Sequence, residues 1–266
     1  LVKKSMKNNG LDDNDLTISD DAIEAVIEYY TREAGVRKLE QQIGKICRKA
    51  VKKLLENTER PIEVTKQNLE EYLGKERFHF EKMNEQDEIG VARGLAWTSV
   101  GGDTLSIEVN VMPGSGKVEL TGKLGDVMKE SAMAAISYIR ANSQKLGIAE
   151  NFHKTKDIHI HVPEGAVPKD GPSAGITMAT AVVSALTKNP VRNDIAMTGE
   201  ITLRGRVLPI GGLKEKSLAA FRAGITDIII PNENKADIDD VPKEVRSKIN
   251  FIPVKSMDTV LENALR

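Results

Sequence analysis

At residues 168–175 the chain reads Pro-Lys-Asp-Gly-Pro-Ser-Ala-Gly, and this stretch is the best guide to the fold around it. Asp170 suits a helix N-cap, and Pro172 suits the first helical position, where its missing N–H costs nothing. Small and apolar residues follow up to residue 183, which predicts a buried helix. Ser173 would then lie in the first turn, where free backbone N–H groups can stabilise an oxyanion. Ser173 is therefore a candidate nucleophile; the alternative is a loop that only caps a buried helix.

The pattern also restricts the base that could activate Ser173. Residues 171–175 fit the G-x-S-x-G motif of the α/β-hydrolase elbow, which requires the order serine, acid, histidine. That order fails, because every histidine precedes Ser173 in the chain. The four histidines are His79, His153, His159 and His161. The base is therefore an upstream histidine or a residue of another type.

His159 and His161 alternate along a predicted strand at residues 157–162, so they project from the same face. They are candidates for a pair of metal ligands, or one of them for a triad base. A zinc site needs at least three protein ligands, and a third is not obvious here. We therefore predict no metal site, and a packed or hydrogen-bonded histidine pair is the simpler interpretation.

A lysine is the other candidate base, provided that its pKa falls well below the ordinary value of about 10.4. A predicted helix at residues 213–223 carries two lysines. At about 100° per residue, Lys216 lies beside Ala220 and Ala223, and Lys214 lies between Leu218 and Phe221. Periodicity allows either lysine, and it also allows a solvated helix end with no chemical role.

The rest of the sequence predicts two domains. Residues 1–80 have apolar residues at helical spacing, notably at 22–27, 36–54 and 67–73, and residues 61–65 interrupt the helices. A polar, charged stretch at 74–90 predicts a boundary. Beyond it, antiparallel strands are expected within 91–120, helices at 125–146 and 172–186, and a hairpin at 201–210. The predicted fold class is α+β, with a helical bundle at 1–80 and a mixed α/β domain at 88–266.

Bulk composition excludes several classes of protein. Lys plus Arg number 38 and Asp plus Glu 39, so no strong overall field draws the chain to nucleic acid. Cys47 is the only cysteine, which excludes an intrachain disulfide. No apolar run approaches the ~20 residues of a membrane span. The first residues contain neither a signal-peptide core nor an initiator Met, so we expect the natural protein to continue upstream.

Three runs together resemble the signature of Lon proteases: residues 168–175, Thr-Gly-Glu-Ile-Thr-Leu-Arg-Gly at 198–205, and Leu-Pro-Ile-Gly-Gly-Leu-Lys-Glu-Lys at 208–216. The resemblance extends back through residues 159–165, 122–125 and 94–98. It implies a peptidase in which Ser173 is the nucleophile and Lys216 is the base and later the proton donor. It also implies that Thr198 helps to hold the lysine, and that Asp170 lies in the active-site loop.

The first 80 residues resemble the small helical domain of the AAA+ ATPase module of the same family. Residues 34–40, Ala-Gly-Val-Arg-Lys-Leu-Glu, look like its sensor-2 motif, with Arg37 as the arginine that meets ATP. The G-x-x-x-x-G-K-[ST] loop is absent, so the chain should not hydrolyse ATP. The resemblance implies that the full-length protein uses ATP and Mg and forms a homo-hexamer. It would act on unfolded or damaged proteins in the cytoplasm, or in a mitochondrial matrix.

Two other hypotheses remain open at this point. The predicted helix at 36–54 carries a row of basic residues that could bind DNA through its phosphates, or a substrate chain, while the C-terminal half is an inactive scaffold. A solvated face is the commoner explanation of such a row. These residues are Lys45, Arg48, Lys49, Lys52 and Lys53. The serine and lysine could also catalyse ester hydrolysis, because the residue types alone do not separate amide from ester chemistry.

Overall fold

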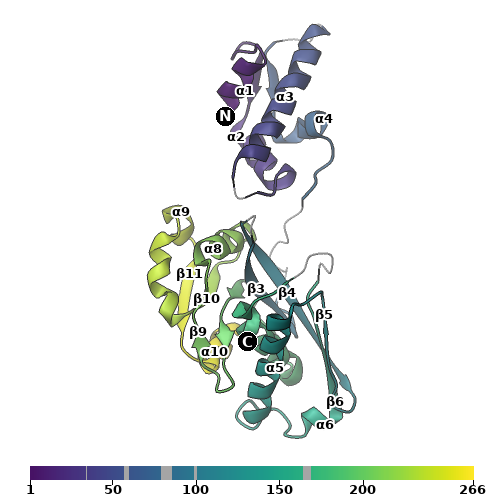
Figure 1. Cartoon of the computed structure of the whole chain (residues 1–266), viewed down its shortest axis with the longest axis vertical. Helices are drawn as coiled ribbons and strands as arrows, with labels where there is room; N and C mark the ends of the chain where they lie inside the picture. Colours follow the sequence, from purple (N-terminus) through teal and green to yellow (C-terminus); the bar gives the residue numbers. More distant parts are fainter. Residues whose placement is uncertain (34, 57–59, 79–85, 99–100, 164–168) are drawn as a thin grey trace. The chain divides into compact units, whose positions relative to one another are not determined.

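The computed structural model describes residues 1–33, 35–56, 60–78, 86–98, 101–163 and 169–266. The chain divides into two compact units, Leu1–Phe80 and Glu81–Arg266, called here the N-terminal unit and the C-terminal unit (Figure 1). Of the residues used in the predictions, Ala34, His79, Pro168 and residues 164–165 lie outside the described residues. So does part of the predicted boundary, at 79–85.

In the N-terminal unit, helix α3 (Arg37–Leu55) matches the helix predicted at 36–54. Its buried residues step by three and four along the chain and so form one apolar face. The other helices are α1 (Val2–Asn8), α2 (Asp20–Ala25) and α4 (Leu69–Leu73), with a π turn η1 (Val26–Tyr30) and a 3₁₀ turn η2 (Lys66–Asn68). The buried face of α3 consists of Leu39, Ile43, Gly44, Ile46, Cys47 and Ala50.

The N-terminal unit also contains a small sheet that the sequence did not predict. Strands β1 (Leu16–Ile18) and β2 (Ile62–Val64) pair in parallel, with Leu16 opposite Ile62. The sequence predicts only a break between helices at residues 61–65. Three residues are too few to display a period, and parallel partners 46 positions apart leave no local signal. The unit is therefore a helical domain with a two-stranded parallel sheet.

The C-terminal unit is built on a seven-stranded sheet in the order β11-β10-β7-β3-β4-β6-β5. Strands β3 and β4 are antiparallel, as predicted, whereas β5 lies parallel to β6. The parallel pair corrects the expectation of antiparallel strands throughout 91–120. The strands are β3 (Val91–Thr98), β4 (Gly101–Pro113), β5 (Val118–Thr121), β6 (Lys156–His161), β7 (Ile195–Met197), β10 (Asp227–Pro231) and β11 (Asn250–Val254).

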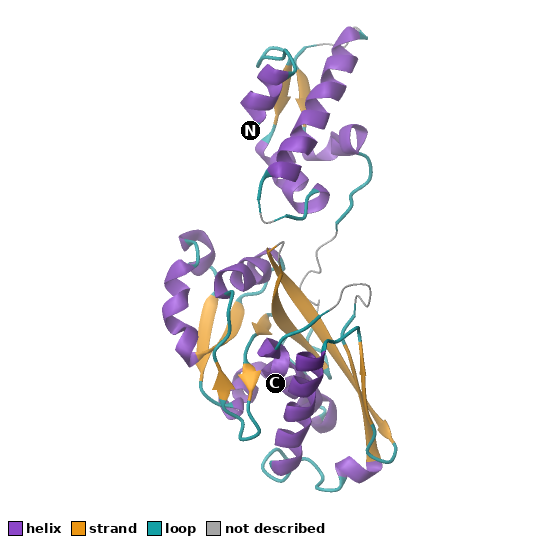
Figure 2. Cartoon of the chain, in the orientation of Figure 1, coloured by secondary structure: helices purple, strands orange, loops and turns teal. Residues whose placement is uncertain are grey.

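Helices cover both faces of this sheet (Figure 2). Residues alternate between the two cores along a strand: Ile229 belongs to one, and Ile228 and Ile230 to the other. The first core also contains residues of α5, α7 and α10, and the second contains residues of α8 and α9. These helices are α5 (Asp126–Ala141), α7 (Gly175–Thr187), α8 (Leu213–Arg222), α9 (Lys243–Arg246) and α10 (Met257–Ala264).

Smaller elements complete the C-terminal unit. Strands β8 (Glu200–Ile201) and β9 (Val207–Leu208) form the predicted hairpin near residues 201–210. A short helix α6 (Phe152–Thr155) precedes β6, and 3₁₀ segments η3 (Pro172–Ala174) and η4 (Asn232–Asp240) precede α7 and follow β10. The predicted helices at 125–146 and 172–186 correspond to α5 and to η3 with α7.

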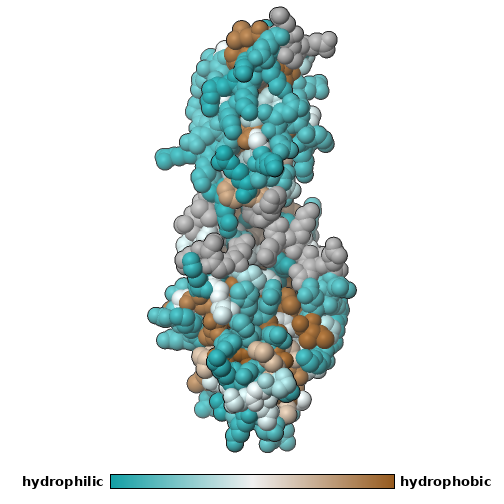
Figure 3. Space-filling view, turned by 90° about the vertical axis from the view of Figure 1, so that its right-hand side faces the viewer, coloured by the Kyte–Doolittle hydropathy of each residue, from teal (hydrophilic) through white to brown (hydrophobic). Residues whose placement is uncertain are grey.

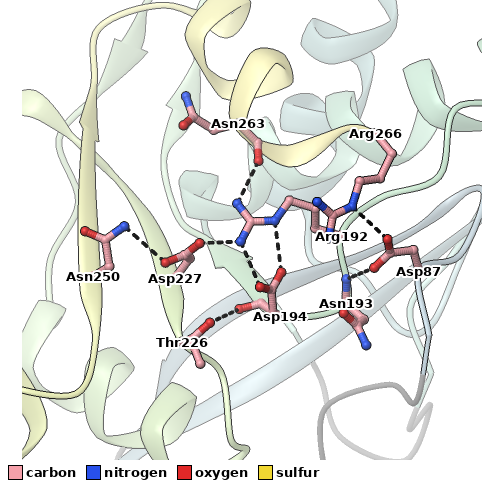
Figure 4. Close-up of polar contacts among 9 residues, drawn as sticks. All are labelled: Asp87, Arg192, Asn193, Asp194, Thr226, Asp227, Asn250, Asn263 and Arg266. Atoms are coloured by element: carbon pink, nitrogen blue, oxygen red, sulfur yellow. Dashed lines mark hydrogen bonds and ion pairs between the residues drawn. The ribbon is translucent and has the colours of Figure 1, made fainter.

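An ion-pair network joins the starts of β7 and β10 (Figure 4). The guanidinium of Arg192 donates to both carboxylate oxygens of Asp194, at 2.9 and 2.8 Å, and also to Asp227. The Arg266 Nε donates to Asp87 at 2.8 Å, which ties the end of the chain to the segment that precedes β3. We call these five residues the arginine clamp. The clamp holds the starts of β7 and β10 together, and it holds Arg266 to the segment before β3.

The surfaces of the two units differ in composition. On the face drawn in Figure 3, hydrophilic side chains cover most of the N-terminal unit, whereas apolar patches interrupt the C-terminal unit. Exposed large apolar residues of the C-terminal unit include Trp97 and Leu203, both 62% exposed. Within the part of the chain that the structure describes, no helix is long and apolar enough to cross a membrane.

Candidate active site

Ser173 lies in a tight turn that leads into a buried helix. Gly171 caps this turn with φ 115°, a conformation that favours glycine, and Pro172 occupies the first position of η3. Helix α7 continues directly from Gly175, and its residues are buried as far as Ala185. The predicted first-turn position of Ser173 is thus confirmed, and the turn is attached to a rigid element.

Asp170 does not cap the helix that follows it, so that expectation was wrong. Its Oδ1 accepts a hydrogen bond from the Gly171 N–H at 2.8 Å and one from the Met128 N–H at 3.1 Å. Met128 lies in the first turn of α5, so the carboxylate caps a helix that lies 42 residues earlier in the chain. The loop before Ser173 is therefore attached to α5.

Lys216 and Lys214 lie on the same helix but in different environments. Lys216 is 2% exposed, and Lys214 is exposed to solvent. Burial lowers the pKa of Lys216 to about 8, because desolvation disfavours the charged ammonium form. Among the described residues, no carboxylate forms an ion pair with Lys216. About a tenth of this amine is therefore neutral at pH 7, and about half of it at pH 8.

Thr198 joins the lysine to the serine turn. It follows β7 directly, is fully buried, and its N–H donates to the Ile229 carbonyl at 3.1 Å. Its Oγ1 accepts from Lys216 Nζ at 3.0 Å and donates to the Ser173 carbonyl at 3.4 Å. The N–H of Gly199 donates to the same carbonyl at 2.8 Å. The backbone of Ser173 and the amine of Lys216 thus meet at one hydroxyl.

Sequence reasoning found Thr198 only through family resemblance, because β7 had not been predicted. The signal available was the short apolar run at residues 195–197, which is too short to be distinguished from a loop. The structure brings Ser173, Thr198 and Lys216 together from three different elements. Among the described residues, Ser173 Oγ and Lys216 Nζ do not share a hydrogen bond.

His159 and His161 lie apart from this site, on the polar face of β6. Thr121 Oγ1 is 2.8 Å from His159 Nε2 and 2.7 Å from His161 Nδ1. Both histidines line an open cleft of ≈ 620 Å³ that includes Glu108 and Asn110. Neither Ser173 nor Lys216 lines this cleft. No group of three or more metal-binding side chains occurs in the described part of the chain.

Arg37 is exposed at the first position of α3, as a phosphate contact would require. The Glu33 carboxylate accepts from the N–H groups of Lys38 and Leu39, at 2.9 Å each, and so caps this end of the helix. Glu33 lies just before the motif and had not been predicted to take part.

The basic residues of α3 are largely engaged within the N-terminal unit. Lys45 Nζ donates to the Leu73 carbonyl at 3.2 Å, and Lys49 Nζ to the Glu71 carbonyl at 3.0 Å. Lys53 Nζ forms an ion pair with Glu71 at 2.6 Å. These three lysines, spaced by four, satisfy groups of α4. This use favours a structural role over phosphate binding for three of the five basic residues.

Comparisons with known proteins agree over the whole chain. Residues 63–266 match the family described as Lon protease (S16) C-terminal proteolytic domain, and residues 7–62 match the Lon protease AAA+ ATPase lid domain. Lon protease 1 of Bacillus subtilis (strain 168) is 58% identical over 265 residues, and the Lon protease of Clostridioides difficile (strain 630) is 58% identical over 266. Each match covers 100% of this chain and 34% of the relative, so the chain spans about a third of their length.

The two family matches meet at residues 62 and 63, whereas the compact units meet at 80 and 81. Physical contacts support the later position. Strand β2 pairs with β1, and Leu69, Tyr72 and Leu73 are buried in the core of the N-terminal unit. Residues 63–73 therefore fold with the lid domain.

Proposed function

Because this chain belongs to the Lon protease family and carries its proteolytic domain, we propose that it cleaves peptide bonds with Ser173 as nucleophile and Lys216 as general base. One observation supports this most strongly. The buried amine of Lys216, with its pKa lowered to about 8, lies 3.0 Å from Thr198 Oγ1, which in turn contacts the Ser173 carbonyl. A neutral amine beside a serine is the arrangement that a serine–lysine pair needs.

In the proposed reaction, neutral Lys216 takes the proton of Ser173 Oγ as the oxygen attacks the substrate carbonyl carbon. The resulting ammonium then gives its proton to the leaving amine, and an acyl-enzyme ester remains on Ser173. Lys216 next activates water, which hydrolyses the ester and restores both groups. One proton of the amine donates to Thr198, which keeps the lone pair available for the serine.

The direct hydrogen bond between Ser173 Oγ and Lys216 Nζ belongs to the proposed complex with substrate. Catalytic hydrogen bonds are often long in the free enzyme and tighten when substrate binds. The backbone contacts of Ser173 to Thr198 and Gly199 already fix the turn relative to β7.

For the whole protein we propose ATP-dependent proteolysis of unfolded or damaged proteins by a homo-hexamer in the bacterial cytoplasm. The match of residues 7–62 to an AAA+ ATPase lid supports a nucleotide-dependent partner domain outside this chain. Arg37, exposed at the capped start of α3, would contact ATP bound there with Mg.

The test is cleavage of an unstructured fluorogenic peptide without ATP by the wild-type chain, Ser173→Ala, Lys216→Ala and Lys214→Ala. We expect Ser173→Ala to abolish turnover and Lys216→Ala to reduce kcat by about 10²–10⁴-fold, the usual contribution of a general base. Lys214→Ala is the matched control, because Lys214 is exposed on the same helix. Undiminished cleavage by Lys216→Ala would contradict the assignment of Lys216 as the base. Comparing the peptide with its matching ester would distinguish a peptidase from an acyl hydrolase.

A further inference from the structure

Helix α5 holds the turn that carries Ser173 at two points. The Met128 N–H donates to Asp170 at 3.1 Å, and Ser131 Oγ donates to the Pro172 carbonyl at 3.3 Å. Met128 and Ser131 are three residues apart, so they lie on the same side of the helix. Ser131 is 7% exposed, and the mechanism proposed above does not use it.

The contact between these elements is close enough to require a glycine. A Cβ atom on Gly175 would lie 2.8 Å from Ser131 Oγ and 2.8 Å from a side-chain carbon of Ile201. Real side chains essentially never make contacts this short, so only glycine allows α5 to approach the turn. The Ser131 hydroxyl is therefore confined between α5 and the start of α7.

The carbonyl that Ser131 binds belongs to the peptide group joining Pro172 to Ser173. A trans peptide is planar, so its N–H points away from its C=O. Holding the Pro172 carbonyl therefore sets the direction of the Ser173 N–H. This N–H is in the first turn of a helix, where no intrahelical acceptor exists, and it donates to no described residue. The backbone N–H of a nucleophilic serine is a typical oxyanion donor.

We propose that Ser131 is a positioning residue that orients the Pro172–Ser173 peptide so that the Ser173 N–H faces the developing oxyanion. This inference rests on the proposed role of Ser173 as nucleophile. Ser131 does not touch the reacting atoms; its hydroxyl acts through the peptide group. Loss of the hydroxyl leaves the Pro172 carbonyl with only its bond from the Gly175 N–H, so the peptide plane can tilt.

The experiment compares the full-length chain as wild type, Ser131→Ala, Ser131→Thr and Ser173→Ala. Ser137→Ala is the matched control, since Ser137 is an exposed serine on the same helix. Three quantities are measured: kcat and KM for the peptide, the inhibition constant of a peptide aldehyde, and the rate of labelling by a fluorophosphonate, read by mass spectrometry. The labelling reports on the serine without requiring turnover, and the aldehyde adduct carries an oxyanion.

Removing one oxyanion donor costs about 10²–10³-fold in kcat, so misaligning one should cost about 10–100-fold. We expect that loss for Ser131→Ala in kcat, labelling rate and aldehyde affinity, with KM and the pH midpoint of activity unchanged. Ser131→Thr keeps the hydroxyl, so its kcat, labelling rate and aldehyde affinity should be close to those of the wild type.

Equal behaviour of Ser131→Ala and Ser137→Ala would overturn the proposal, as would an equal loss in Ser131→Thr, which would assign the loss to packing. A shifted pH midpoint in Ser131→Ala would also overturn it, because the effect would then act through Lys216. If Ser173→Ala is labelled and cleaves the peptide as fast as the wild type, Ser173 is not the nucleophile. The positioning role of Ser131 is then wrong as well. If only Ser173→Ala is impaired, the positioning role alone is wrong.

Discussion

Two cations flank strand β7, one of them partly buried and the other fully buried, and they differ in their partners. At the start of the strand, Arg192, whose side chain is 18% exposed, is paired with Asp194 and Asp227. Hydrogen bonding to Asp194 raises the pKa of Arg192 further, and the same contact lowers the pKa of Asp194. At the other end, Lys216 is 2% exposed and has a threonine hydroxyl as its partner.

The difference shows that the cation at one end of a strand can stabilise the fold while the cation at the other end serves as a base. A buried cation with carboxylate partners stays charged and fixes the elements that supply those carboxylates. A buried amine without a carboxylate partner loses part of its charge and becomes a base. The arginine clamp (Figure 4) can hold β7 and β10 at their starts, while the amine at the end of β7 keeps a pKa of about 8.

The largest expected effect comes from giving Lys216 a carboxylate partner. In Thr198→Asp, the new carboxylate should pair with Nζ and return the lysine pKa to about 10, so the neutral fraction of the amine at pH 8 falls about 50-fold. We expect kcat/KM at pH 8 to fall by about the same factor relative to Thr198→Asn, the uncharged variant of similar size. The measurement is kcat/KM between pH 6 and 10.5, where activity should rise with a midpoint near 8 in the wild type. Identical profiles for the two variants would contradict this account of the base.

The reverse change removes Arg192, one of the two cations of the arginine clamp. Arg192→Met leaves Asp194 and Asp227 without their cation, and we expect the C-terminal unit to lose about 2–3 kcal/mol of unfolding free energy, less than a fully buried pair because the site is partly exposed. Denaturant unfolding measures the loss. Adding Asp227→Asn should recover part of it, since one uncompensated charge is then removed. Arg266→Met is the control and should cost less, because this side chain is 55% exposed. If the double variant loses as much unfolding free energy as Arg192→Met and Asp227→Asn lose together, the two charges are not coupled.

The sequence predicted the parts of this site that depend on local pattern. Helix periodicity located α7 and α8, and the Gly-Pro-Ser order placed Ser173 in a first turn, because caps and apolar spacing act within a few residues. Periodicity alone did not separate Lys216 from Lys214, since their difference in burial comes from the elements packed around α8. The contact of Asp170 with α5 and the pairing of β1 with β2 are likewise contacts between distant segments, which no local pattern records.

Lys216 should itself destabilise the fold in a pH-dependent way. Its folded pKa of about 8 lies below its unfolded value of 10.5, so the unfolded chain binds more protons between these two values. Stability should therefore rise with pH across that window, and the penalty is fully present below pH 8. Lys216→Met should raise the unfolding free energy at pH 7 by up to about 3 kcal/mol, and this gain should disappear near pH 10.5. Urea unfolding at several pH values tests this, with Lys214→Met as the exposed control. A gain independent of pH would mean that packing, and not charge, is responsible.

The smallest effect is expected where a lysine is neither buried nor isolated from carboxylates. Lys53 on α3 pairs with Glu71 at 2.6 Å, and this hydrogen bond raises the lysine pKa. Both side chains are well exposed, at 36% and 61%, so water and salt screen the pair. Lys53→Met should therefore lower the unfolding free energy of the N-terminal unit by at most about 0.5 kcal/mol, and less in 1 M salt. Thermal unfolding at two salt concentrations measures it, with Lys52→Met as the control, since the Lys52–Glu56 contact is longer, at 3.9 Å. A loss of several kcal/mol would mean that Lys53 stabilises the fold as Arg192 does. The greater exposure of Lys53 would then not explain a difference between the two cations.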